Sequence, residues 1–165
     1  MEEFLPRGRA KIAYKFLNPM PNDSILDVGC AQGYFERYFL IGKVSKVKGV
    51  DINLKAIEYC SKKDGKEYYL HCAAEKLPFQ DNEFDKVLCL DTLEHVDDEV
   101  KTISEIRRVL RPNGLLVLSV PNDFLNFMDL SNIKFNFPRL YRLFCCLKEK
   151  NVGTLLSLSF TVITI

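Results

Sequence analysis

A short apolar segment that leads into a glycine turn constrains the fold of this chain more than any other feature. Ser24–Val28 has the length and composition of a buried strand, and residues 29–33 form a turn with glycine at both ends. Residues 34–40 then follow a helical period. A strand, a glycine turn and a helix in this order predict the start of an α/β fold.

The alternation of strand and helix continues along the chain. Further strands are expected at residues 47–50, 68–72, 86–90 and 115–120, and further helices from Asn53 onward and over residues 98–110. A helix over residues 9–17 precedes them and would lie on the sheet as a lid or cap. The alternation predicts a Rossmann-like, doubly wound fold, in which helices cover both faces of a mostly parallel sheet.

Apolar side chains at helical spacing predict which helix faces are buried. The helix after the glycine turn is expected to bury Phe35, Tyr38 and Phe39. The next helix is expected to turn Leu54 and Ile57 inward.

A length of 165 residues favours a single domain. Residues 1–22 would form an N-terminal cap, residues 23–120 the cofactor-binding core, and residues 121–165 an apolar segment that contributes to a substrate site. That last segment holds 8 charged residues in 45, and we expect one helix over residues 138–148 and one strand over residues 157–165. The sheet would therefore end in a reduced hairpin.

Composition disfavours several functional classes. With 23 Lys and Arg against 22 Asp and Glu, the formal charge of +1 leaves no general positive field for a nucleic acid. The six cysteines show no CxxC pair and no metal-ligand spacing, which favours free thiols in a reducing, cytoplasmic compartment. No signal-peptide pattern begins the chain, and its most apolar stretch, residues 155–165, is too short to span a membrane as a helix. We therefore expect neither a nucleic-acid partner nor an integral membrane segment.

The residues that follow each strand are the candidate site, because ligands of open parallel sheets bind beyond the carboxyl ends of the strands. Four such places are the turn Gly29–Gly33, Asp51, residues 73–75 and residues 91–95. The two glycines would let the backbone approach a ligand closely. Taken alone, such a turn is equally well a tight connection that binds nothing.

Asp51 shifts this balance towards a nucleoside site. It ends the second strand 18 residues after Gly33, where a carboxylate can accept hydrogen bonds from both hydroxyls of a ribose. A dinucleotide, and with it a nicotinamide-dependent oxidoreductase, is disfavoured, because Tyr34 replaces the third glycine of GxGxxG and Asp27 would face a phosphate. These residues indicate a cationic nucleoside without phosphate.

At this point four segments resemble the successive motifs of class I S-adenosylmethionine-dependent methyltransferases: ILDVGCAQGYF, VDIN, AAEKLPFQDNEFDKVLCLDTLEHV and EIRRVLRPNGLLVLSVPN. The resemblance covers about residues 24–122 and is closest to the small-molecule branch, although Asn113 stands where glycine is usual. It implies S-adenosylmethionine as the cofactor and methyl transfer to a small-molecule or lipid-like acceptor. With one strand after residue 120, the chain would be a C-terminally truncated member, or one whose sheet edge needs a partner such as a second copy.

The resemblance also implies roles for individual residues. Asp51 would hold the ribose, and Ile52 would pack on the adenine, whose edge Ala74 would meet through its backbone. The first turn and the end of the fourth strand would surround the methionine part, and the cofactor-binding residues there are Asp27, Gly29, Cys30, Ala31, Gly33, Leu90 and Asp91.

Two positions depart from the family pattern. Ala31 takes the place of the usual middle glycine, and a positive φ there would cost on the order of 1 kcal/mol. Ala73 stands where the family often has an Asp on the adenine amino group, and the lost hydrogen bond would lower the affinity roughly tenfold. Glu75 is a candidate to compensate, or else a solvated acid of the loop.

Methyl transfer from a sulfonium needs alignment more than acid–base chemistry. For a hydroxyl acceptor His95 is the candidate base, since it follows the fourth strand and would titrate near neutrality; the alternative is that it packs at the start of the next helix. The aromatic residues between 124 and 144 would wall an apolar substrate pocket, cover the sheet or meet another subunit. The alternative to an enzyme is a non-catalytic module that binds the cofactor and acts through a partner.

Overall fold

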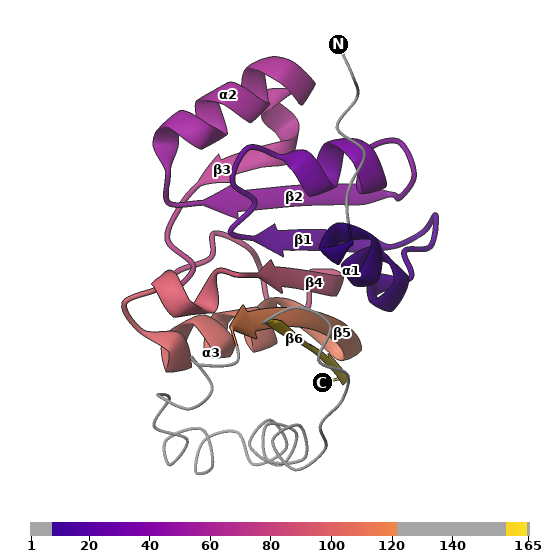
Figure 1. Ribbon diagram of the computed structural model, residues 1–165, viewed down its shortest axis with the longest axis vertical. Coiled ribbons are helices and arrows are strands. Elements are labelled where there is room, and N and C mark those ends of the chain that lie inside the picture. Colours follow the sequence, from indigo (N-terminus) through magenta and orange to yellow (C-terminus); the bar gives the residue numbers. More distant parts are fainter. Residues whose placement is uncertain (1–7, 122–157, 165) are drawn as a thin grey trace.

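The computed structural model describes residues 8–121 and 158–164, which form one six-stranded sheet in the order β3-β2-β1-β4-β5-β6 (Figure 1). Its parallel strands are β1 (Ser24–Val28), β2 (Lys46–Asp51), β3 (Tyr69–His71), β4 (Phe84–Leu90) and β5 (Leu110–Pro121). β6 (Leu158–Thr164) pairs antiparallel with β5. Strand order reverses between β1 and β4, so the predicted Rossmann-like, doubly wound sheet is confirmed.

Within the described ranges, three α-helices connect or precede these strands: α1 (Arg9–Leu17), α2 (Leu54–Asp64) and α3 (Glu99–Val109). Asn53 is the N-cap of α2 as predicted, and its side chain accepts a hydrogen bond of 3.3 Å from the Ala56 amide. Asp98 caps α3 in the same way, accepting from Lys101 at 2.9 Å. Shorter helical turns are the π-helical η1 (Glu36–Leu40) and the 3₁₀ turns η2 (Lys66–Tyr68) and η3 (Leu93–His95).

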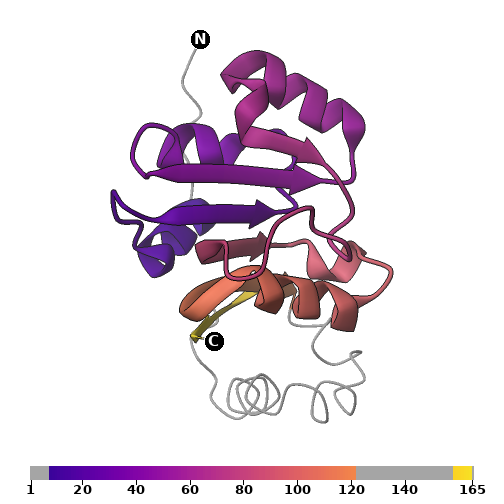
Figure 2. The same ribbon diagram turned by 180° about the vertical axis from the view of Figure 1, so that it is seen from behind.

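Successive residues of each strand point to opposite faces of the sheet, and each face has its own apolar core. On one face, α1 and η1 bury Ala13, Leu17 and Phe39 against the sheet. On the other face, seen in Figure 2, α3 buries Ile103 and Ile106 against it. Both cores fix the strand ends that form the site described below.

The predicted burial of Phe35 and Phe39 is confirmed, whereas the predictions for Tyr38 and Leu54 are wrong. Tyr38 is 39% exposed and its ring contacts that of Tyr34 at a tilt, whereas Glu36 is fully buried in its place. The cause is the π-helical winding of η1, which places more than 3.6 residues in a turn and rotates the buried face. Leu54 is 50% exposed because it is the first residue of α2, where the chain has just left the sheet edge; Ile57 is buried as expected.

The end of the chain is described only in part. β6 confirms the strand expected over residues 157–165, whereas the expected helix over residues 138–148 and the aromatic residues between 124 and 144 lie outside the described residues. Among the described helices, none is long and apolar enough to cross a membrane.

Candidate functional site

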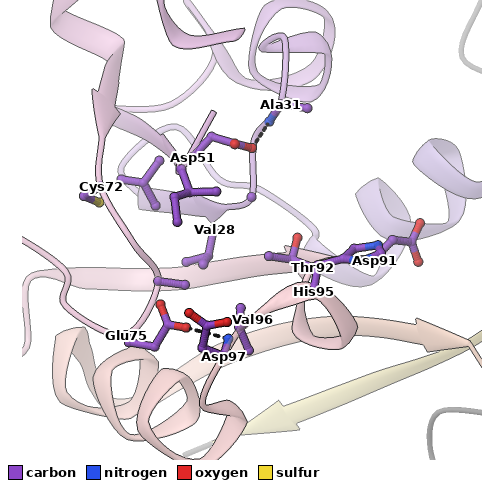
Figure 3. Close-up of a pocket in the computed structure, with 14 residues that line it drawn as sticks. Val28, Ala31, Asp51, Cys72, Glu75, Asp91, Thr92, His95, Val96 and Asp97 are labelled. Carbon is purple, nitrogen blue, oxygen red and sulfur yellow. Dashed lines mark hydrogen bonds between the residues drawn. The ribbon is translucent and has the colours of Figure 1, made fainter. Parts of the chain in front are cut away.

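A cavity of about 300 Å³ opens beyond the carboxyl ends of the strands, where the strand order reverses (Figure 3). β1 contributes Val28 and the start of the glycine turn, β2 contributes Val50 and Asp51, and the segments after β3 and β4 close the remaining sides. This is the edge at which the sequence places its candidate residues.

The glycines at the two ends of the turn both have positive φ angles, +84° at Gly29 and +68° at Gly33. A Cβ at Gly29 would lie 2.6 Å from Cγ2 of Thr92, which follows β4. The amides of Gly29 and Cys30 both donate to the carbonyl of Val50, at 2.8 and 3.0 Å. The turn is therefore held tightly against the ends of both β2 and β4.

Ala31 has a φ of +46°, so the strain expected for this departure from glycine is present. Asp51 helps to hold it there: one carboxylate oxygen accepts from the Ala31 amide at 2.8 Å, and the other accepts from Asn53 at 2.7 Å. Figure 3 shows Asp51 reaching from β2 towards the turn. Each carboxylate oxygen keeps a second lone pair for a ligand.

Two acids lie buried behind the turn. Asp27 is 4% exposed, and Glu36 is fully buried with no hydrogen-bond partner for either carboxyl oxygen among the described residues. Burial raises the pKa of Asp27 to about 7, and the charge of Asp51 adds to the rise. Burial and then the charge of Asp27 raise the pKa of Glu36. Gly49 leaves the room for Glu36, because a Cβ there would lie 2.5 Å from its Oε1.

One end of the cavity is lined by residues after β2 and β3. Ile52 is 71% exposed at the mouth, and Cys72 and Ala74 line the wall, where burial raises the pKa of the Cys72 thiol to about 11. The Glu75 carboxylate accepts from the Asp97 amide at 2.9 Å, which ties the segment after β3 to the segment after η3 (Figure 3).

The other end is formed by residues after β4. Asp91 has a φ of +50°, and its amide donates to the carbonyl of Ser119 at 3.0 Å. The Ser119 hydroxyl donates to the Asp91 carboxylate at 2.8 Å, and Arg9 of α1 forms an ion pair with the other carboxylate oxygen. His95 is exposed on the cavity wall, at the end of η3.

The structure brings most of the sequence-predicted residues to this one cavity. Its lining includes Gly29, Ala31, Asp51, Ile52, Ala74, Glu75, Asp91 and His95. Four others do not line it: Asp27, Cys30, Gly33 and Leu90. The first three of these support the turn from behind, since Cys30 is 5% exposed and the Gly33 amide donates to the Cys30 carbonyl at 3.0 Å.

Sequence reasoning missed Cys72, Asp97 and Arg9. Cys72 directly follows β3 and belongs to the same class of strand-end residues, so the rule that found its neighbours also applies to it. Nothing local marks Arg9, which reaches the site only because α1 packs on the sheet. Among the described residues no group of three or more His, Cys, Asp or Glu is arranged to hold a metal ion.

Known proteins share this core. A family model described as "Methyltransferase domain" matches residues 26–118. A malonyl-[acyl-carrier protein] O-methyltransferase of Buchnera aphidicola is 34% identical over 59% of this chain and 39% of its own length. A tRNA U34 carboxymethyltransferase of Nautilia profundicola is 31% identical over 67% of this chain and 39% of its own length.

The fold is shared as well. The crystal structure of the YcgJ protein from Bacillus subtilis superposes with a TM-score of 0.62 at 26% identity, over 68% of this chain and 50% of that one. The chain spans about two fifths of the length of the two curated relatives named above. The match to more than half of the chain, together with the shared fold, shows that it belongs to the methyltransferase domain family of S-adenosylmethionine-dependent methyltransferases.

Proposed function

We propose that this chain transfers a methyl group from S-adenosylmethionine to a small-molecule or lipid-like acceptor. The observation that carries the proposal is the convergence of Gly29, Asp51 and Asp91 on one cavity at the point where strand order reverses. Bound S-adenosylmethionine supplies a methyl group already activated by its positively charged sulfur. The protein has to bind, orient and shield this group rather than activate it.

The residues present fit that cofactor. Asp51 keeps free lone pairs for ribose hydroxyls, Ile52 offers an exposed apolar face for the adenine, and Ala74 offers backbone at the adenine edge. The turn presents no Cβ at Gly29, so backbone can lie against the ligand. Asp27, Cys30, Gly33 and Leu90 would act from behind by keeping the turn and the end of β4 in place.

The charge around the cavity favours a small-molecule acceptor over a polyanion such as a nucleic acid. Among the described residues that line it, four are acids, namely Asp51, Glu75, Asp91 and Asp97, and one, His95, is basic. Such a rim attracts a cationic cofactor and repels a phosphate backbone. The tRNA named for one relative is therefore not the acceptor that we propose here. The four described cysteines are free thiols, which supports a reducing, cytoplasmic setting.

For a hydroxyl acceptor, we assign the base to His95. Its exposed ring stands on the cavity wall at the end of η3, within reach of a group that enters from the open side. A neutral imidazole accepts a proton at physiological pH without a further group to activate it. Removal of the ring should therefore lower turnover and leave cofactor affinity in place.

The test is calorimetry with S-adenosylhomocysteine, followed by transfer of labelled methyl groups. Wild type is expected to bind, and Asp51→Ala to bind about 100-fold more weakly, because two charge-assisted hydrogen bonds are lost. The labelled cofactor is then incubated with a small-molecule extract or with bulk tRNA. Label in the small-molecule fraction supports the proposal, and label in tRNA alone contradicts it.

Two further outcomes separate the alternatives. Failure of wild type to bind S-adenosylhomocysteine would overturn the proposed function altogether. Binding without transfer to any fraction would favour the non-catalytic module, an alternative that the alanine at position 73 motivates. Asp51→Ala serves in both arms as the control for transfer that does not depend on this cavity.

A further inference from the structure

One ion pair joins the N-terminal helix to the site. Arg9, the first residue of α1, pairs with Asp91, which lies 82 positions later and directly after β4. Both side chains are partly exposed, at 40% for Arg9 and 37% for Asp91. Exposed pairs of this kind stabilise a fold by less than about 1 kcal/mol, so stability alone explains little of this arrangement.

The structure fixes both partners before any ligand arrives. Ala13 and Leu17 of α1 are fully buried against the sheet, so the first turn of the helix has a set position. On the other side, the Asp91 amide donates to the Ser119 carbonyl, and the Ser119 hydroxyl donates to the Asp91 carboxylate. Neither charge therefore needs to be ordered when a ligand binds, which favours binding.

The pair lies at one particular end of the cavity. Asp91 lines it beside Thr92 and the turn residue Gly29, and Figure 3 draws Asp91 at the opposite end of the row from Cys72. If Asp51 holds the ribose, as the proposed function requires, the adenine and amino-acid parts of the cofactor lie on opposite sides of it. The end with Ile52 and Cys72 suits the adenine, which leaves the Asp91 end for the amino-acid part.

We propose that Arg9 binds the carboxylate of the cofactor's amino-acid part while Asp91 binds its ammonium. This inference rests on the proposed function and adds α1 to the cofactor site. The amino-acid part carries one positive and one negative charge, and the Arg9–Asp91 pair presents the complementary charges side by side. A guanidinium has five N–H donors, so Arg9 can keep Asp91 on one edge and hold a carboxylate on another.

The test compares two ligands that differ only by this carboxylate: S-adenosylmethionine and its decarboxylated form. Calorimetry is carried out on wild type, on Arg9→Met and on Lys11→Met, a control that removes an exposed positive charge from the same helix. Wild type and Lys11→Met are expected to prefer S-adenosylmethionine by roughly 10- to 100-fold. Arg9→Met is expected to lose most of that preference, with little change in affinity for the decarboxylated ligand.

Three results would overturn the inference. Full retention of the preference by Arg9→Met, or an equal loss of affinity for both ligands, would make Arg9 a purely structural residue. Stronger binding of both ligands by this variant would make the ion pair a latch that competes with the cofactor. Failure of wild type to bind either ligand is a different result, because it would overturn the proposed function as well. A thermal unfolding curve of each variant checks that α1 remains folded.

Discussion

The acids of this site fall into two groups that differ in burial. Asp27 and Glu36 lie behind the glycine turn, almost without exposure, and Glu36 has no hydrogen-bond partner among the described residues. Asp51 and Asp91 lie on the cavity side of the same turn, where each accepts hydrogen bonds from donors that the fold has fixed. Two sets of carboxyls thus flank one loop only a few residues long.

The difference shows that residue type alone does not assign a role at this edge of the sheet. An acid on the cavity side is already oriented and keeps lone pairs for a ligand, so it is suited to binding. An acid behind the turn is buried and not hydrated, which raises the free energy of its ionised form relative to its neutral form. We therefore expect the buried pair to control stability and the exposed acids to control binding.

The largest effect should be on the pH dependence of stability. The pKa of Asp27 is raised to about 7 in the folded protein, so the folded state binds more protons than the unfolded state between about pH 4 and pH 7. Stability from this group is full below that range and is lost as the pH rises through it, by about 4 kcal/mol at most. Urea unfolding of wild type and Asp27→Asn should show the variant gaining relative stability from pH 4 to pH 7.

A control separates burial from charge. Glu58→Gln removes an exposed carboxyl from α2, and its free energy of unfolding should show the same pH dependence as that of wild type. Comparison with wild type also cancels the opposing effect of Glu83, Asp85 and Glu105, whose pKa values are lowered. A constant difference between Asp27→Asn and wild type over this range would remove the distinction between the two groups of acids.

The second effect concerns the turn that separates the two groups. Gly29→Ala should lower the free energy of unfolding by about 2 to 3 kcal/mol, because its φ of +84° strains an alanine and the new Cβ would lie 2.6 Å from Cγ2 of Thr92. Gly42→Ala is the matched control, since Gly42 has a φ of +75° but no atom within 4 Å of a Cβ. It should cost only about 1 kcal/mol. Equal losses would mean that contact with Thr92 does not shape the turn.

Much of the fold follows from local signals in the sequence. β1 and α1 have the predicted bounds, because turn residues or prolines stand on both sides of a short apolar or periodic run. The faces of the helices were harder to predict. Tyr38 and Leu54 are exposed because the winding of η1 and the departure of the chain at the start of α2 depend on neighbours that no local period records.

The site divides in the same way. Strand-end residues such as Asp51 and Asp91 were predictable, because a parallel sheet brings all its carboxyl ends to one edge. The contacts of Arg9 and Ser119 with Asp91 span 82 and 28 positions. Such contacts depend on how α1 and β5 pack, so they require the structure. The burial of Glu36 likewise depends on Gly49, on a strand that follows it in the chain.

The smallest effect is expected at Ala31, which stands between the two groups of acids. Its φ of +46° costs about 1 kcal/mol, and Ala31→Gly relieves that strain at the expense of a more flexible unfolded chain. The net gain in unfolding free energy should therefore be below about 1 kcal/mol, with the amide still donating to Asp51. Ala56→Gly, in α2, is the matched control and should lose about 1 kcal/mol, because glycine disfavours a helix. If urea unfolding gave both variants the same loss, the alanine Cβ at position 31 would be stabilising the turn through packing, and its backbone strain would not be the dominant contribution.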